Sequence, residues 1–180
     1  LRLSDIAGVS VRAVLRPAAQ AGATDIVIHV TEMTAITSRV SIDNYGNYYT
    51  GANRLTANVN LNDALGLGET FGINTQNSFE GLRIAGLSYA MPIGSSGLSI
   101  GASVAELQYN VGKNLKDAQA SGSAKVSAFF INDQLYRSRK ANVNLSLGAE
   151  FRHFEDITSA TVVNKAERFL SASLYGDWRD

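Results

Sequence analysis

The chain has 180 residues, and its 16 Lys and Arg residues balance its 16 Asp and Glu residues, so the formal net charge is zero. This balance disfavours nucleic-acid binding, which depends on a clustered basic surface that displaces counterions from phosphates. The absence of cysteine excludes disulfides, cysteine-ligated zinc and thiol nucleophiles. No apolar run reaches the roughly 18 residues of a transmembrane helix, so this sequence can span a membrane only with β-strands.

Residues 1–34 differ in pattern from the rest of the chain. We expect residues 1–8 to end a helix at Gly8, followed by two strands over residues 9–16 and 24–31. Such a hairpin is too small to be stable alone, so it is expected to be the C-terminal part of a larger α+β module. The first strand is predicted to bury one face, which carries its apolar residues. These are Val9, Val11, Ala13 and Leu15.

From residue 35 to residue 180 the sequence changes to segments of about ten residues separated by Gly, Asn and Asp turns, a pattern typical of transmembrane barrels. Strands of this length exceed those of most soluble sheets and suit a tilted bilayer crossing. The sequence therefore predicts a mainly β fold, with an antiparallel up-and-down sheet that forms part of a barrel. The eight expected strands are residues 37–43, 53–62, 69–77, 81–91, 98–110, 122–132, 140–153 and 166–175.

Alternation is clearest in the seventh of these strands. Leu145 and Leu147 share an apolar face, whereas Asn144 and Ser146 share a polar one. In a barrel the apolar face would contact lipid and the polar face would line an aqueous lumen. In a soluble β-sandwich the polar face would contact bulk water, and periodicity alone does not separate the two cases.

Two sets of polar residues in the barrel-like region allow more than one interpretation. In the fifth strand Glu106 and Gln108 follow Val104 on one face, which predicts either a β-bulge or a strand that extends beyond the membrane. Basic residues elsewhere could line the lumen and contact an unfolded substrate, or could lie at the rim of the barrel. These residues are Arg54, Arg83, Lys125, Arg137, Arg139 and Arg152.

The sequence predicts no catalytic residue, metal ligand or cofactor site. The two histidines, His29 and His153, lack the spacing of metal ligands. The serines of residues 94–97 lie between two strands, where a hairpin turn is a better account than a nucleophile elbow. Residues 66–68 (Gly-Leu-Gly) precede no helix and are therefore expected to form a turn rather than a phosphate-binding loop.

Several motifs resemble those of one known family. The strings DNYGNYYTGANRL, VNLNDALGLGET and LSYAMPIGSSGLSIGASVAELQY resemble the start of the barrel in two-partner secretion transporters, the haemolysin secretion/activation family. LYRSRKANVNLSLGAEFRHFED resembles a later strand of that barrel, after an Arg-Ser-Arg turn. The opening string GVSVRAVLRPAAQAGATDIVIHVTE is similar to the end of the family's second polypeptide-transport-associated (POTRA) module. The matches occur in the family's order and cover nearly the whole chain.

The resemblance implies an outer-membrane barrel that conducts a large exoprotein, in unfolded form, without nucleotide hydrolysis. Residues 1–34 would be the C-terminal part of a periplasmic POTRA module. Residues 35–180 would be the N-terminal half of the barrel, about eight of sixteen strands, so the chain is expected to be a fragment. The family's gating loop, plug helix and first POTRA module have no match here, and we carry over no gating residue.

The resemblance also implies where a secreted partner would make contact. The first strand is a candidate edge for β-augmentation, although it could simply pack within its own module. Polar residues of the barrel wall could contact the chain in transit, and outer-membrane lipid is expected on the other side. Two alternative functions remain, a barrel-assembly protein and a surface adhesin or soluble β-sandwich. The candidate contact residues are Val9, Val11, Ala13, Leu15, Arg54, Asn58, Asn60, Asn144 and Arg152.

Overall fold

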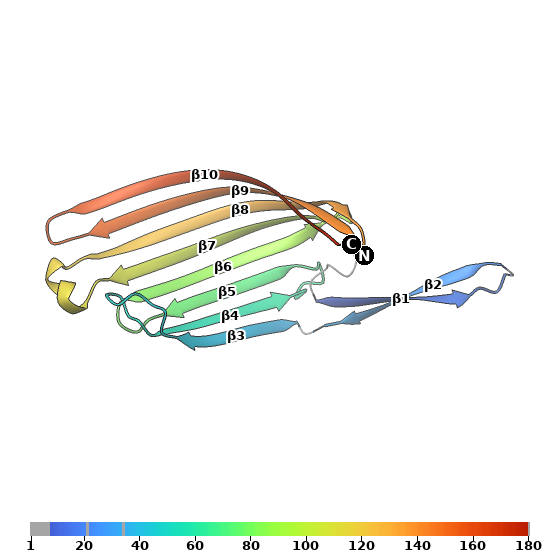
Figure 1. Cartoon of the computed structure of the whole chain (residues 1–180), viewed down its shortest axis with the longest axis horizontal. Coiled ribbons are helices and arrows are strands. Elements are labelled where there is room, and N and C mark those ends of the chain that lie inside the picture. The colour runs from blue at the N-terminus through green and yellow to red at the C-terminus, as the bar shows by residue number, and fades with distance from the viewer. Residues whose placement is uncertain (1–7, 21, 34, 180) are drawn as a thin grey trace.

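The computed structural model describes residues 8–20, 22–33 and 35–179, and these residues form two antiparallel sheets. The smaller sheet is a hairpin of β1 (Val9–Pro17) and β2 (Thr24–Glu32), which projects from one end of the larger sheet (Figure 1). The expected helix over residues 1–7 lies outside the described residues. No helix in the described part of the chain is long and apolar enough to cross a membrane.

The larger sheet has eight strands, and each pairs with its neighbours in the sequence. All eight predicted strands are confirmed, but the last three have 17 residues each and exceed the prediction. Their polar ends resemble turns in sequence, yet they continue the ladder of paired strands. The strands are β3 (Ile36–Asp43), β4 (Arg54–Asn62), β5 (Thr70–Asn77), β6 (Leu82–Ile93), β7 (Leu98–Asn110), β8 (Ser121–Arg137), β9 (Ala141–Ile157) and β10 (Val162–Trp178).

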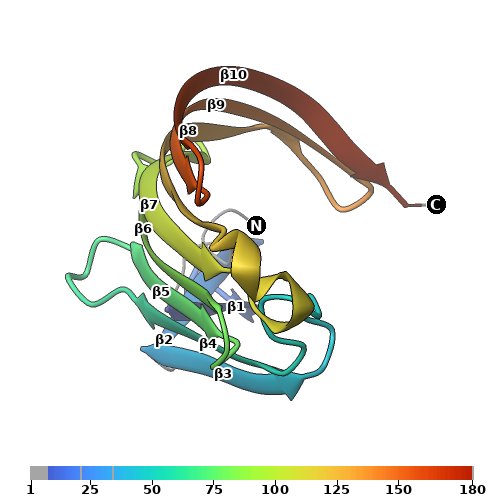
Figure 2. The same cartoon turned by 90° about the vertical axis from the view of Figure 1, so that its left-hand side faces the viewer.

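The eight-stranded sheet curves into an open arc. Figure 2 looks along the strands and shows one curved wall, with β3 and β10 at its two edges. A β-sandwich would instead place two sheets face to face. The single curved meander confirms the expectation of a mainly β, antiparallel portion of a barrel wall.

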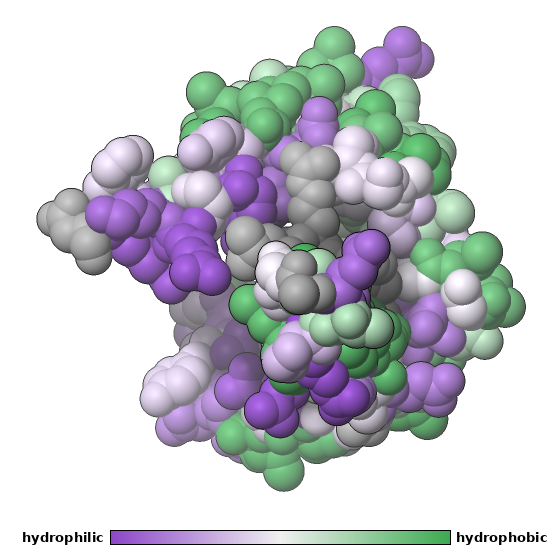
Figure 3. Space-filling model, turned by 90° about the vertical axis from the view of Figure 1, so that its right-hand side faces the viewer, coloured by the Kyte–Doolittle hydropathy of each residue, from purple (hydrophilic) through white to green (hydrophobic). Residues whose placement is uncertain are grey.

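The two faces of this wall differ in polarity. Among the described residues, Ala141 is the only buried hydrophobic one, so the sheet has no apolar core of its own. Its large apolar side chains are exposed instead, for example Leu170 with 88% of its surface accessible. Figure 3 shows hydrophobic residues along the outer rim and hydrophilic residues gathered within the hollow. This arrangement suits a wall with lipid outside and water inside.

Of the two alternatives predicted near Glu106, the β-bulge is wrong, and the strand continues without interruption to Asn110. β7 and β8 pair without interruption from Leu98 to Asn110, and Glu106 lies directly opposite Lys125. The register shift lies instead between Asp133 and Tyr136 of β8. Glu106 and Gln108 lie on the same outer face as Val104, and polar side chains on this face do not disturb backbone pairing. A break in the polarity pattern is therefore not evidence of a β-bulge here.

Two predicted turns are confirmed. Gly94 and Gly97 have φ angles of 65° and 93° in the turn between β6 and β7, a conformation that favours glycine. Residues 63–69 form the turn between β4 and β5, which folds around the buried side chain of Glu69. The Glu69 carboxylate accepts the backbone N–H groups of Leu65 and Leu67 at 2.7 Å and 3.1 Å. A carboxylate within the turn thus occupies the position that an external anion would take in a phosphate loop.

The face of β1 that was predicted to be buried is only partly covered by the described residues, since Val9 and Val11 are half-buried and Ala13 and Leu15 are exposed. Val11, Ala13 and Leu15 pair with Val30, Ile28 and Ile26 of β2 to form one apolar surface. Leu15 is 69% accessible, because nothing among the described residues covers its side chain.

Candidate functional site

A row of directly paired residues crosses the concave face of the large sheet. In such a row, side chains on successive antiparallel strands point to the same side. The row places Asn58 of β4 and Arg152 of β9 on one wall, although 94 positions of sequence separate them (152 − 58). The side chains at the centre of the row are small, and those at its two ends are charged. The row consists of Arg39, Asn58, Asn74, Gly86, Ala105, Val126, Arg152 and Glu167.

Polar contacts order the first part of this face. Arg54 donates to Asp43 across the β3–β4 pair, with Nε 2.8 Å from Oδ1. When the Gln76 amide is oriented with its oxygen toward Arg54, it also accepts hydrogen bonds at 3.2 Å. Asn60 lies one row away, opposite Thr37 and Gly72. Arg54, Asn58 and Asn60 therefore share one hydrogen-bonding surface.

The last strands carry the opposite end of the face. Arg152 forms an ion pair with Glu150, and its guanidinium carbon lies 4.5 Å from the ring centroid of Phe169. Lys165 forms an ion pair with Glu167 on β10. Asn144 lies closer to the β1–β2 hairpin, directly opposite Tyr175.

Sequence reasoning missed the aromatic residues of this face. Phe130 lies in the same row as Gly101 and Gly148, and Phe169 and Tyr175 lie on the same side of β10. Phe130 has the same parity as Asn132 on β8, so the period of two was a usable signal for it. The inner surface combines short polar groups with a few large rings.

The predicted contact residues fall into two groups. Arg54, Asn58, Asn60, Asn144 and Arg152 share the concave face. The residues of β1 lie apart from them, in the projecting hairpin.

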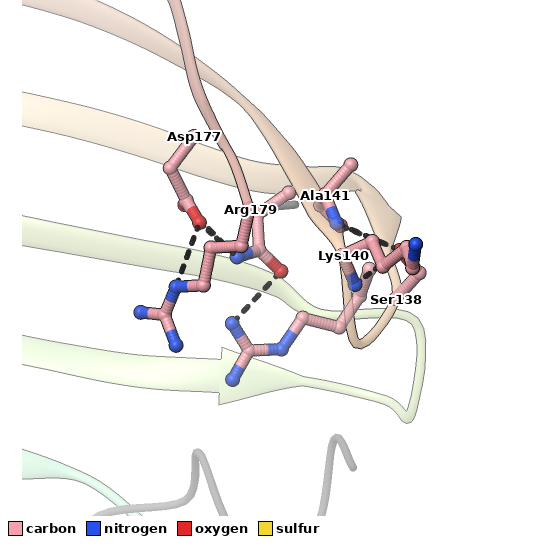
Figure 4. A network of polar contacts seen from close by, with 7 residues as sticks. Ser138, Lys140, Ala141, Asp177 and Arg179 are labelled. Carbon is pink, nitrogen blue, oxygen red and sulfur yellow. Dashed lines mark hydrogen bonds and ion pairs between the residues drawn. The ribbon is translucent and has the colours of Figure 1, made fainter.

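A polar network joins the ends of β8, β9 and β10 nearest the hairpin (Figure 4). Arg137 donates to the Asn142 side chain at 3.0 Å, and the Asn142 amide nitrogen donates to both oxygens of Asp177 at 2.9 Å. Arg179 lies 3.9 Å from the same carboxylate. In the adjoining turn the Ser138 hydroxyl accepts the backbone N–H of Ala141 at 2.9 Å. These contacts fix the Arg-Ser-Arg turn against the inner wall.

At the opposite end of the sheet, hydrogen bonds and an ion pair join three loops on the concave side: residues 44–53, residues 78–81 and the segment that contains η2 (Lys113–Ala118). Figure 2 shows the loop 44–53 and η2 inside the arc of the sheet. Gly112 N–H donates to the Tyr49 carbonyl at 2.8 Å, and the buried Ser78 hydroxyl donates to the Thr50 carbonyl at 2.5 Å. Lys113 forms an ion pair with Glu80, and this contact raises the pKa of Lys113.

The six basic residues divide between the two faces. Arg54, Arg137 and Arg152 share the concave face with polar neighbours. Arg83 pairs with Asn77 and Gln108, and Lys125 pairs with Glu106 and His153, both on the outer face. Arg139 lies in the turn between β8 and β9.

Within the described part of the chain, the outer edge of β1 pairs with no other strand. Gly8 C=O accepts Met33 N–H at 2.8 Å, and Ala18 N–H donates to Ala23 C=O at 3.2 Å. Because hydrogen-bonded and non-hydrogen-bonded pairs alternate in antiparallel strands, every odd-numbered residue of β1 directs its N–H and C=O away from β2. These residues are Val9, Val11, Ala13 and Leu15, while Pro17, which has no N–H, ends the series.

No described residues form a group of three or more His, Cys, Asp or Glu that could hold a metal ion. The profile of the haemolysin secretion/activation protein ShlB/FhaC/HecB matches residues 22–175, most of the chain. The chain belongs to the ShlB/FhaC/HecB family. Proteins of this family are outer-membrane barrels, so the chain is an outer-membrane protein.

Individual relatives agree with this assignment. The chain is 27% identical over 184 residues to the heme/hemopexin transporter protein HuxB of two Haemophilus influenzae strains, 86-028NP and Rd. The alignment covers 99% of the chain and 32% of HuxB, so the chain spans about a third of these relatives.

Solved structures show the same fold. CdiB from Escherichia coli superimposes with a TM-score of 0.83 and CdiB from Acinetobacter baumannii with 0.77, each at 15% identity. Each alignment covers 99% of this chain and 35% of CdiB. BamA from Haemophilus ducreyi, lacking POTRA domains 1–3, gives a lower TM-score of 0.58 at 14% identity, with 99% of this chain and 37% of BamA covered.

Proposed function

We propose that this chain forms part of a protein-conducting pore that secretes one dedicated exoprotein, of haemolysin or adhesin type, across the outer membrane. The observation that carries the proposal is the row from Arg39 to Glu167 on the concave wall of a family member, which has polar or charged side chains at both ends and small or apolar ones at its centre. An unfolded polypeptide exposes backbone donors and acceptors along its length, and short amide and hydroxyl side chains can exchange hydrogen bonds with it. Lipid would contact the outer face.

In this proposal residues 1–34 are the C-terminal part of a POTRA module and residues 35–180 are the N-terminal half of the barrel. The hairpin then lies in the periplasm, which places η2 and the loop 44–53 on the extracellular side. Transport requires no catalytic residue, nucleotide or cofactor in this chain, because the wall contributes contacts rather than chemistry. HuxB is named for heme/hemopexin transport, so a haem-linked exoprotein is one candidate class of cargo.

The periplasmic hairpin would receive the exoprotein before it enters the barrel. The unpaired N–H and C=O groups of Val9, Val11, Ala13 and Leu15 can pair with an extended client segment by β-augmentation. The apolar side chains of these residues share one face, which supplies contacts for alternate side chains of the client.

Proline substitutions test this role of the edge. Val11→Pro removes an outward N–H while leaving the β1–β2 hydrogen bonds in place, since proline is tolerated on edge strands. We expect the full-length transporter with this change to insert normally but to bind the exoprotein more weakly. Ile28→Pro is the matched control, because it removes an outward N–H from the other edge of the hairpin. Equal binding by the Val11→Pro variant and the native transporter would contradict the assignment.

A gene-deletion experiment tests the proposed secretion function. Deleting the gene should abolish the appearance of one large exoprotein outside the cell while leaving other outer-membrane barrels at normal abundance. The rival function, barrel assembly, predicts a general loss of those barrels. The higher TM-scores of the two CdiB structures than of BamA favour secretion.

A further inference from the structure

A cluster of basic side chains lies on the outer face of the wall, where it cannot contact a polypeptide that passes through the lumen. His153 of β9 pairs directly with Lys125 of β8, and Arg168 of β10 pairs with Phe151, two positions along β9 from His153. All three cluster residues, Lys125, His153 and Arg168, are exposed. Among the described residues neither Lys125 nor Arg168 has an ion-pair partner.

Acidic residues on this face only partly offset the cluster. Glu106 lies opposite Lys125, but its carboxylate accepts the Gln108 amide at 3.1 Å. Glu155 lies two positions further along β9 from His153, toward the η2 end. Arg168 has Phe151 as its cross-strand neighbour and no carboxylate in that position. A guanidinium on a lipid-facing wall is costly unless it reaches an interface or an anionic partner.

An apolar depression of about 550 Å³ lies on the same outer face, four residues along β8 from Lys125. Its walls include Tyr89, Phe129, Ile131 and Leu147. The depression exists because Ala102 and Ala149, the cross-strand partners of Phe129, are too small to fill the space beside its ring. It runs across β6 to β9, and the basic cluster lies closer to the η2 end, on β8, β9 and β10.

We propose that the cluster and the depression together bind one phosphorylated glycolipid of the outer leaflet. Its phosphate groups would pair with Lys125, His153 and Arg168, and an acyl chain would fill the depression. Guanidinium and ammonium groups form strong charge-assisted hydrogen bonds with phosphate, and an apolar groove favours a hydrocarbon chain. The orientation rests on the proposed function, which places the η2 end outside the cell.

The test measures binding of fluorescent lipid A, which carries phosphates, to the full-length transporter in detergent. Lys125→Gln/Arg168→Gln should weaken binding by about tenfold or more, since each basic residue near a charged lipid contributes to affinity. Ala102→Leu/Ala149→Leu should weaken it as well by filling the depression. Arg83→Gln is the matched control, because Arg83 is an exposed basic residue on the outer face outside the cluster. Dephosphorylated lipid A should bind weakly to every variant.

Two results would overturn the proposal. One is native-like lipid A binding by the Lys125→Gln/Arg168→Gln variant. The other is full displacement of lipid A by inorganic phosphate together with native binding by the filled-depression variant, which would mean a site for free phosphate. Heat-modifiable migration shows whether each variant is folded, and exoprotein secretion is measured in parallel. A native transporter that secretes the exoprotein but binds lipid A no better than dephosphorylated lipid A would likewise defeat this proposal alone, whereas a native transporter that binds lipid A but secretes nothing would defeat the proposed function alone.

Discussion

The ring of Phe130 on β8 lies against the backbone of Gly101 on β7, so closely that a Cβ atom on Gly101 would stand 2.2 Å from Phe130 Cζ. The Tyr89 carbonyl oxygen would stand 2.7 Å from the same Cβ, so the backbone blocks this space as well. Glycine at position 101 therefore lets an aromatic ring lie flat on the inner wall.

We expect Gly101→Ala to destabilise the barrel by on the order of 1–3 kcal/mol, because the ring and the neighbouring strand must both move. Heat-modifiable migration of the full-length protein should show unfolding at a lower temperature. Ser103→Ala, on the same face of β7, is the control and should unfold close to the native temperature. An unchanged Gly101→Ala variant would mean that the ring can move aside freely.

The apolar band on the outer wall predicts a strong contrast between two nearby positions of β9 that lie on opposite faces. Leu147 lies between Ile131 and Ala172 on the lipid-facing side, whereas Asn144 faces the lumen opposite Tyr175. Leu147→Arg should cost roughly 2–4 kcal/mol near the bilayer midplane. Leu145 is a less decisive position, because Asp133 faces outward beside it.

Membrane-inserted protein after expression measures this contrast. The Leu147→Arg variant should accumulate poorly and the Asn144→Arg variant should accumulate normally. Equal loss for the two substitutions would refute the assignment of faces.

The turn over residues 63–69 should respond to acid. Burial raises the pKa of the Glu69 carboxyl, but hydrogen bonds from the backbone N–H groups of Leu65, Leu67 and other turn residues outweigh it and lower the pKa below its ordinary value of 4.5. Because the pKa of Glu69 is lower in the folded protein than in the unfolded chain, the ionised carboxylate stabilises the turn at pH values above the unfolded pKa. This stabilisation is lost as the pH falls through the folded pKa.

Hydrogen exchange, corrected for intrinsic rates, should therefore show residues 63–69 protected near neutral pH and progressively less protected below pH 4.5. Glu69→Gln should lower protection at neutral pH and remove the acid dependence, since an amide cannot be deprotonated. Asp25→Asn, on exposed β2, provides the control. Acid-dependent protection that persists in the Glu69→Gln variant would assign the effect to another group.

Arg152 should influence ion passage, because its guanidinium lies on the inner wall beside Glu150 and Glu167. Arg152→Gln removes the positive charge and leaves these carboxylates facing the lumen, so the full-length pore should become more cation-selective. Reversal potentials across planar bilayers in a salt gradient measure this change. Arg83→Gln, on the outer face, should leave the reversal potential unchanged, and an equal shift in both variants would place Arg152 outside the conducting path.

The sequence predicted the strands well because a period of two is visible within each segment, as in Leu145 and Leu147 opposite Asn144 and Ser146. It predicted their ends poorly. Asp156 and Asn164 resemble turn residues, yet they belong to the paired ends of β9 and β10. Local composition cannot distinguish a turn from a strand that has left the membrane.

The site was predictable only one strand at a time. Parity correctly indicated that Asn58 and Arg152 belong to polar faces, but their common row depends on the register of five successive strand pairs, from β4–β5 to β8–β9. Each register is set by turn geometry and by packing across strands. Phe130 was missed for a related reason, since its ring needs Gly101 on the neighbouring strand.

The central claim is that the polar concave face of this wall contacts the exoprotein during transport. A photo-reactive amino acid can be placed in turn at Asn58, at Val59 and at Phe151 of the full-length transporter, in cells that secrete the exoprotein. Asn58 faces the lumen, whereas Val59 and Phe151 face lipid. The account predicts that a stalled exoprotein cross-links at Asn58 and not at Val59 or Phe151. Cross-links at Val59 and Phe151 with none at Asn58 would contradict it.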